Sequence, residues 1–173
     1  LYKGEGMDWN GDITDLNAGV YVVNRIHEET NSEVFIYDAY AKFSWRNLLL
    51  EGEVLTIRGQ TEGIALPSAD PENPLAKEAD IMGTVARIGY QNGGLKAIFE
   101  AGYASGDDNP GDGVFTGRAL HPDYNVGLLL YEEILARVSQ NVWEGKLNGL
   151  RSRGGVYNSS YIYPHVSLEF LPG

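Results

Sequence analysis

The chain has 173 residues and no cysteine, and its 24 acidic and 13 basic side chains give a net charge of −11. Such an acidic balance argues against binding to nucleic acid, which needs a basic face, and the lack of thiols excludes disulfides and thiolate metal sites. With 43% hydrophobic residues and no compositional break along the chain, the sequence predicts one folded domain over residues 1–173.

The first two predicted elements are strands. In 16–27, and more cleanly in 33–47, apolar and polar side chains alternate with a period of two. The odd positions from Phe35 to Trp45 are all apolar, whereas the even positions from Ile36 to Arg46 are almost all polar. A helix would mix these two sets, because its turn of about 3.6 residues does not match the alternation. We therefore predict strands with one apolar and one polar face.

Four further segments continue the pattern, at 48–57, 82–91, 95–103 and 156–170. Several of the six segments have 12 or more residues. An average soluble strand has about 5–6 residues, whereas a tilted strand needs about 9–11 to cross a membrane. The longest apolar stretches have six residues, too few for a membrane-spanning helix of about 20. We predict an all-β fold, an antiparallel up-and-down meander that forms a transmembrane β-barrel.

The predicted links between the strands are alternately short and long. Tight turns at 45–47 and 91–94 contrast with loops at about 59–78 and 107–153. Outer-membrane barrels show this alternation, with short periplasmic turns and long extracellular loops. Because such a barrel needs about eight strands to close, we expect the chain to be an incomplete part of a larger barrel.

Residues 124–144 interrupt the strand pattern. Leu128, Tyr131, Leu135 and Val138 fall at helical spacing, which predicts one helix in the longest loop, placed at the mouth of the pore. A loosely patterned pair of strands is the alternative for the same residues.

In a barrel of this kind the polar face of the sheet lines the pore. Ten residues of the predicted polar face would form this wall: Arg25, Asp38, Tyr40, Lys42, Arg46, Glu51, Glu53, Arg87, Lys96 and Glu100. Five of them are basic and four are acidic, so the wall is nearly neutral. A channel for a polyanion needs an excess of positive charge. We therefore expect passive passage of small polar or carbohydrate-like solutes.

Four large aromatic side chains fall near strand ends on the predicted apolar face: Tyr37, Trp45, Tyr90 and Tyr103. In a membrane barrel they would form the girdles that contact lipid and lipopolysaccharide at the two interfaces. In a soluble or surface-exposed β-sandwich that binds carbohydrate, the same side chains would lie in the core. Their positions fit both folds, so the β-sandwich stays the alternative.

The run Glu100–Gly113 is the most specific motif, and it reads Glu-Ala-Gly-Tyr-Ala-Ser-Gly-Asp-Asp-Asn-Pro-Gly-Asp-Gly. It resembles the alginate-export family of bacterial outer-membrane barrels, in which a strand runs into Tyr-Ala-Ser-Gly-Asp and a loop of Asp, Asn, Pro and Gly follows. This resemblance implies a porin-like barrel in the outer membrane of a Gram-negative bacterium. The sequence departs from the family directly afterwards, at Phe115–Gly127. Together with the nearly neutral wall, this departure disfavours alginate itself as the solute.

Three carboxylates of the same run, from Asp107, Asp108 and Asp112, gather on a glycine-rich loop. Oxygen ligands of this kind are those that Ca²⁺ prefers, although the spacing is not that of an EF-hand. Acidic residues also form ordinary solvated turns. A Ca²⁺ site and a plain turn both stay open, and we expect no other cofactor.

The sequence shows no catalytic motif. It lacks the Gly-x-Ser-x-Gly turn that presents a nucleophilic serine, and His27, His121 and His165 are too scattered for a zinc site. We predict that the chain is not an enzyme. A membrane-barrel hydrolase with a Ser–His pair is the second alternative.

Overall fold

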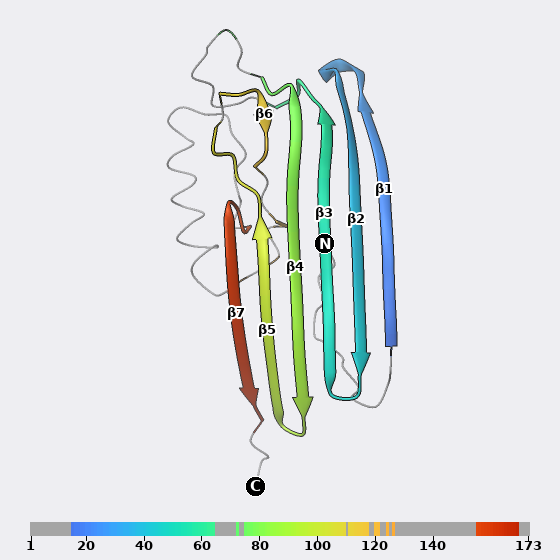
Figure 1. Cartoon of the computed structure of the whole chain (residues 1–173), viewed down its shortest axis with the longest axis vertical. Helices are drawn as coiled ribbons and strands as arrows, with labels where there is room; N and C mark the ends of the chain where they lie inside the picture. The colour runs from blue at the N-terminus through green and yellow to red at the C-terminus, as the bar shows by residue number, and fades with distance from the viewer. Residues whose placement is uncertain are drawn as a thin grey trace.

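The structure is a computed structural model that describes residues 15–64, 72, 75–109, 111–117, 120, 121, 124, 126 and 155–169. These residues form one sheet of long antiparallel strands (Figure 1). The strands are β1 (Asp15–His27), β2 (Ser32–Trp45), β3 (Leu48–Gln60), β4 (Glu78–Asn92), β5 (Leu95–Ala104), β6 (Val114–Phe115) and β7 (Ser159–Leu168). A single turn of 3-10 helix, η1 (Glu28–Thr30), joins β1 to β2.

The six long strands follow the chain as an up-and-down meander in the order β1-β2-β3-β4-β5-β7. Each pairs antiparallel with its neighbour, while the two-residue β6 pairs parallel with the start of β4. The predicted all-β meander is thus confirmed. The described strands form an open sheet, with β1 and β7 at its edges.

The predicted strand bounds need small corrections. β3 and β4 reach Gln60 and Glu78, so the link between them spans 61–77. The last strand begins at Ser159, and Val156, which we expected inside it, lies before the strand and is fully buried. The predicted helix at 124–144 lies outside the described residues except for Tyr124 and Val126.

Two tight turns set the register of the meander, as predicted. Arg46 and Asn47 join β2 to β3, and Gly93 and Gly94 join β4 to β5. Arg46 and Gly93 have positive φ angles, of 50° and 57°. Left-handed residues in a two-residue loop match the right-handed twist of the flanking strands, so the pairing of these strands is fixed by local sequence.

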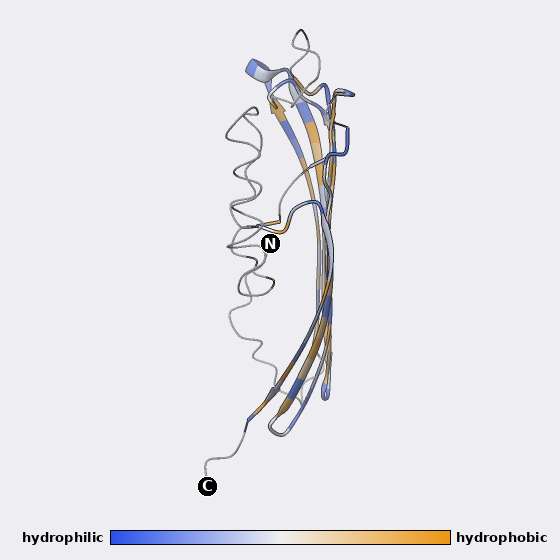
Figure 2. Cartoon of the chain, turned by 90° about the vertical axis from the view of Figure 1, so that its left-hand side faces the viewer, coloured by the Kyte–Doolittle hydropathy of each residue, from blue (hydrophilic) through white to orange (hydrophobic). Residues whose placement is uncertain are grey.

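The long strands of the sheet bow along their length (Figure 2). The strand register gives the sheet two contrasting faces. The apolar face carries side chains such as Val20 of β1, Ala41 of β2, Ile88 of β4 and Ile162 of β7. Large side chains on it are exposed, with Val20 at 75% and Ile162 at 69%. No described residue forms a second layer over this face.

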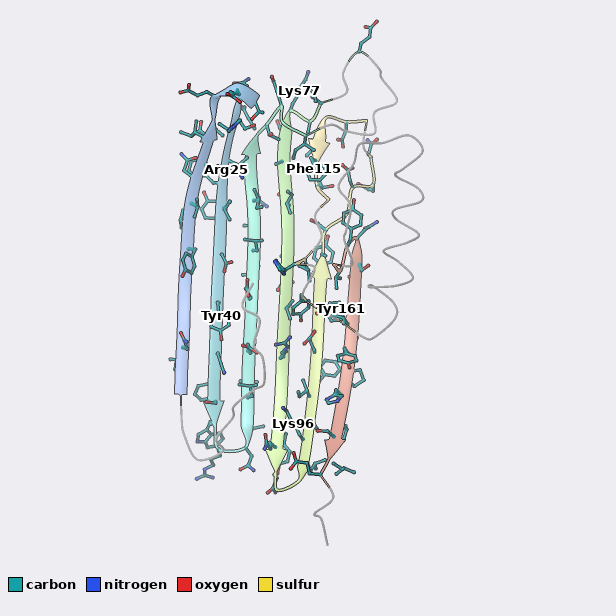
Figure 3. The ribbon with its side chains drawn as sticks, turned by 180° about the vertical axis from the view of Figure 1, so that it is seen from behind. Arg25, Tyr40, Lys77, Lys96, Phe115 and Tyr161 are labelled. Atoms are coloured by element: carbon teal, nitrogen blue, oxygen red, sulfur yellow. The ribbon has the colours of Figure 1, made fainter. Side chains whose placement is uncertain are left out.

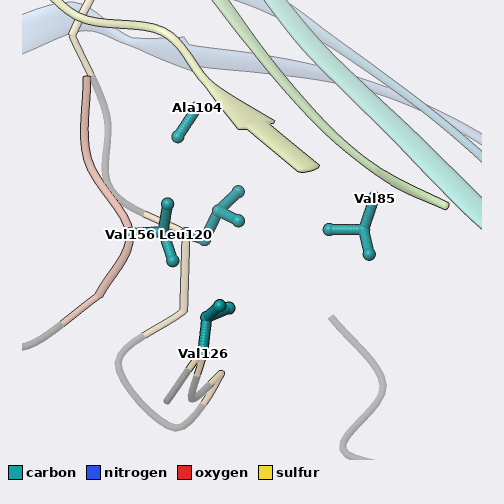
Figure 4. Packing of buried hydrophobic residues seen from close by; sticks show 5 residues of the cluster. All are labelled: Val85, Ala104, Leu120, Val126 and Val156. Atoms are coloured by element: carbon teal, nitrogen blue, oxygen red, sulfur yellow. The ribbon is translucent and has the colours of Figure 1, made fainter. Parts of the chain in front are cut away.

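The opposite, polar face holds the buried residues. One cluster joins Val85 and Ala104 of the sheet to Leu120, Val126 and Val156 of the link between β6 and β7 (Figure 4). A second cluster joins the sheet residues Ile57 and Ile81 to Ala76 and Phe115. The buried residues of the long links that the structure describes therefore pack on the polar face.

The described residues include no helix long and apolar enough to cross a membrane.

Candidate functional site

A row of alternating charge crosses the polar face. Lys42 of β2 lies opposite Glu51 of β3, Glu51 lies opposite Arg87 of β4, and Arg87 lies opposite Glu100 of β5. Directly opposed residues in antiparallel strands have Cβ atoms about 4.5–5.5 Å apart. Strand pairing therefore gives both Glu51 and Arg87 a neighbour of opposite charge on each side.

Arg87 is the centre of this row. Its Nε donates to Glu100 Oε2, and its Nη1 lies 3.4 Å from Glu51 Oε2. Its Nη2 donates to the Tyr124 hydroxyl over 3.3 Å, and its Cζ lies 5.5 Å from the centre of the Tyr124 ring, within the range of a cation–π contact. The side chains of Arg87 and Glu100 are only 25% and 7% exposed, so solvent screens this pair less than an ion pair on the surface.

Tyr124 attaches the link between β6 and β7 to this row. Its hydroxyl donates to Glu100 Oε1 over 2.5 Å and lies 2.9 Å from the Tyr161 hydroxyl, which also donates to Glu100 Oε1, over 2.7 Å. Burial raises the pKa of Tyr124, and its hydrogen bond to the Glu100 carboxylate raises this pKa further. The Tyr124 hydroxyl therefore keeps its proton as a donor at neutral pH. Glu100 accepts hydrogen bonds from Arg87 and from both tyrosines.

Tyr161 can reach Glu100 because the residue opposite it is a glycine. Tyr161 of β7 pairs with Gly102 of β5, and a Cβ atom at Gly102 would overlap the Tyr161 ring. The ring thus lies across the bare backbone of β5, with its hydroxyl directed at the charged row. Figure 3 shows Tyr161 and Tyr40 at a similar level, midway along the strands.

We expect Gly102→Ala to displace the Tyr161 ring and to lower the free energy of unfolding by about 1–3 kcal/mol, the usual cost of overpacking. Protease cleavage between β6 and β7 should become faster, because Tyr124 loses one of its partners. Gly19→Ala is the matched control, since a Cβ atom at Gly19 on the same face meets nothing within 4 Å. Equal behaviour of the two variants would show that Tyr161 does not hold the link.

A small cavity adjoins the row on the β2 side. It has a volume of about 30 Å³ and is lined by Tyr40, Glu51, Glu53, Arg87 and Tyr124 among others. This volume has room for about one water molecule. The Tyr40 hydroxyl donates to Glu51 Oε1 over 3.1 Å, so both carboxylates beside Arg87 also accept a tyrosine hydroxyl. The five named side chains around this cavity are hydrogen-bond donors and acceptors.

Comparison of the chain with protein-family models, with curated proteins and with solved structures finds no match. The resemblance of Glu100–Gly113 to the alginate-export family stays a prediction from those residues.

Nine of the ten residues predicted for the pore wall lie on the polar face of the sheet: Arg25, Asp38, Tyr40, Lys42, Glu51, Glu53, Arg87, Lys96 and Glu100. The structure places Arg46 elsewhere. It lies in the turn after β2, where its Cζ is 5.2 Å from the centre of the Trp45 ring. Trp45 belongs to the apolar face, so alternation cannot be extended through the turn to Arg46.

Sequence reasoning missed Tyr124 and Tyr161 as members of the site. Tyr124 lies at the start of the range 124–144, for which the sequence predicts a helix, and Tyr161 lies in the predicted strand 156–170, where no pattern singles it out. Gly102 within the predicted strand 95–103 is a usable signal, because glycine in a strand often marks close approach by another group, here the Tyr161 ring. No local pattern pointed to Tyr124.

The acidic loop after β5 shows two turn-forming side chains. Asp107 Oδ1 accepts from the Asn109 backbone N–H over 3.2 Å, and Asp112 Oδ1 accepts from the Val114 N–H over 2.8 Å. Burial raises the pKa of Asp107, and the nearby charges of Asp112 and Asp108 act in the same direction. Among the described residues, no group of three acidic or histidine side chains is arranged to hold a metal ion. The Ca²⁺ site at Asp107, Asp108 and Asp112 therefore stays a prediction.

Proposed function

We propose that this chain forms part of the wall of an outer-membrane β-barrel pore, through which small polar or carbohydrate-like solutes pass. The observation that carries the proposal is which face of the sheet is exposed, because it is the reverse of the arrangement in a soluble protein. The apolar face is exposed, while the polar face holds the charged row and the buried link residues that the structure describes. A soluble protein avoids a continuous exposed apolar surface of this extent, whereas lipid requires one.

The height of the apolar face supports this environment. On β4 the outward positions from Met82 to Tyr90 lie between the polar residues Asp80 and Asn92. The eight steps from Met82 to Tyr90, at about 3.3 Å each, give about 26 Å along the strand, or about 20 Å along the membrane normal at a tilt of about 40°. The twelve steps between Asp80 and Asn92 give about 30 Å along the normal, so the edges of the band lie between these two heights. The apolar band of outer-membrane barrels is about 25 Å tall.

Aromatic side chains lie toward both ends of this band. Tyr37 and Tyr103 lie nearer the η1 end of the sheet, and Trp45 and Tyr90 lie at the end with the tight turns. All four are exposed. Two aromatic girdles at the interfaces are typical of outer-membrane barrels, so the predicted girdle residues support the membrane reading over the β-sandwich. The β-sandwich would need a second layer over this face, and the described residues supply none.

The polar face would then form the pore wall. Arg87 is paired with Glu51 and Glu100, so the central row offers hydrogen-bonding groups with little uncompensated positive charge. Such a wall suits neutral or mixed-charge solutes, which exchange water for fixed donors and acceptors. The link attached through Tyr124 would narrow the pore, and no chemical step is assigned to the protein.

We expect the full-length protein to require detergent for extraction from membranes, to shift in gel mobility on boiling, and to make liposomes permeable to sugars. The folded barrel resists unfolding by detergent at room temperature, which is why heating changes its mobility. Release into buffer without detergent, together with unchanged mobility, would contradict the membrane fold. A mobility shift without sugar flux would contradict the transport function alone.

A further inference from the structure

A larger cavity lies on the polar face near the η1 end of the sheet, away from the charged row. It has a volume of about 340 Å³ and lies between β1–β4 and the turn after β3. Its floor is apolar and includes the buried side chains of Ile57 and Ile81, with Val34 beside them. Cavities of about 300–1,000 Å³ with an apolar lining and a few polar groups are typical of small-molecule sites.

One side of the cavity carries a chain of hydrogen-bonded polar groups. His27 Nδ1 lies 2.8 Å from Thr30 Oγ1, Thr30 Oγ1 lies 2.9 Å from Ser32 Oγ, and Ser32 Oγ lies 2.9 Å from Thr61 Oγ1. The Gly63 backbone N–H donates to Thr61 Oγ1 over 3.1 Å, which ends the chain. Because these groups position one another, they form a preorganised edge of donors and acceptors.

Arg25 gives this cavity its charge. None of the eleven described residues that line it is acidic, although the whole chain carries 24 acidic side chains. Within the described part of the chain, no hydrogen bond or ion pair engages the Arg25 guanidinium. Figure 3 shows Arg25 toward the same end of the strands as Phe115 and Lys77. A cation that meets no carboxylate among the described residues, beside hydroxyls and above an apolar floor, matches an anion with an apolar body.

We propose that this cavity binds small organic monocarboxylates whose body is apolar. The carboxylate contacts Arg25 and the chain of hydroxyls, and the apolar body packs on Ile57 and Ile81. A sugar acid fits less well, because its hydroxyl-covered body would lose water against the apolar floor. The proposal goes beyond solute passage and does not depend on it, since the site is tested by binding at equilibrium.

The test titrates the full-length protein in detergent micelles with benzoate, with its neutral isostere benzamide and with glucuronate, by calorimetry and ligand-observed NMR. We expect saturable binding of benzoate. Benzamide lacks the negative charge and glucuronate lacks the apolar body, so each should bind at least about ten-fold more weakly. Arg25→Gln should weaken benzoate binding about ten-fold, and Arg25→Lys should weaken it less.

Arg58→Gln is the matched control. It removes the same charge from the same end of the sheet, but Arg58 lies on the apolar face and pairs with Asp80 over 3.0 Å. Unchanged benzoate affinity in this variant supports the site. The proposal is wrong if benzoate does not saturate, if benzamide or glucuronate binds as well as benzoate, or if Arg58→Gln and Arg25→Gln weaken binding equally.

Discussion

We expect Ala41→Arg to lower the free energy of unfolding in lipid vesicles by about 2–4 kcal/mol, the cost of an arginine at the bilayer midplane on the outside of a barrel. Ala41 lies in the middle of the apolar face, in register with Ala18 of β1 and Gly52 of β3, and its side chain is exposed. If water bathed this face, the same substitution would change stability by only about 0.5 kcal/mol or less. The measurement is urea unfolding of the vesicle-inserted protein, followed by tryptophan fluorescence.

Two variants separate the lipid effect from other effects of the substitution. Gln60→Arg makes the same change of charge on the same face, but Gln60 pairs with Glu33 and Glu78 beyond the apolar band. It should leave stability unchanged or slightly improved. Ala41→Leu adds bulk without charge and should also be tolerated. Equal stability of Ala41→Arg and Gln60→Arg would show that the apolar face does not contact lipid.

Much of the sheet could be predicted from the sequence because its determinants are local. The period of two assigns each side chain from Phe35 to Trp45 to a face, and two-residue turns fix which residues lie opposite each other. A slip of one residue would exchange the faces of a whole strand, so the alternation also specifies the register. The charged row from Lys42 to Glu100 follows from these two facts.

The parts that could not be predicted depend on contacts between distant segments. Leu120, Val126 and Val156 come from long links, and their burial against Val85 depends on the path of the chain rather than on a periodic pattern. The same holds for Tyr124, whose hydroxyl meets Glu100 across 24 positions of sequence. Alternation indicates the two faces of a strand, but it does not indicate which loop covers one of them.

Arg87→Met should lower the free energy of unfolding by about 3–5 kcal/mol, because it leaves the carboxylate of Glu100 largely buried without its cation. Glu100 is 7% exposed and Glu51 is 15% exposed, so water cannot fully replace the lost partner of either. The two tyrosine hydroxyls that donate to Glu100 compensate only part of the charge. Urea unfolding in vesicles gives the size of the loss.

A second substitution in the same protein separates the effect of removing the Arg87 charge on stability from the effect of removing its side chain. Glu100→Gln on the Arg87→Met background should restore part of the lost stability, because a neutral amide replaces the uncompensated carboxylate. Arg58→Met is the surface control: Arg58 and Asp80 are 69% and 56% exposed, and breaking such a pair costs about 1 kcal/mol or less. If Arg87→Met were no more destabilising than Arg58→Met, the charged row would be exposed to solvent and would not hold Tyr124 against the sheet.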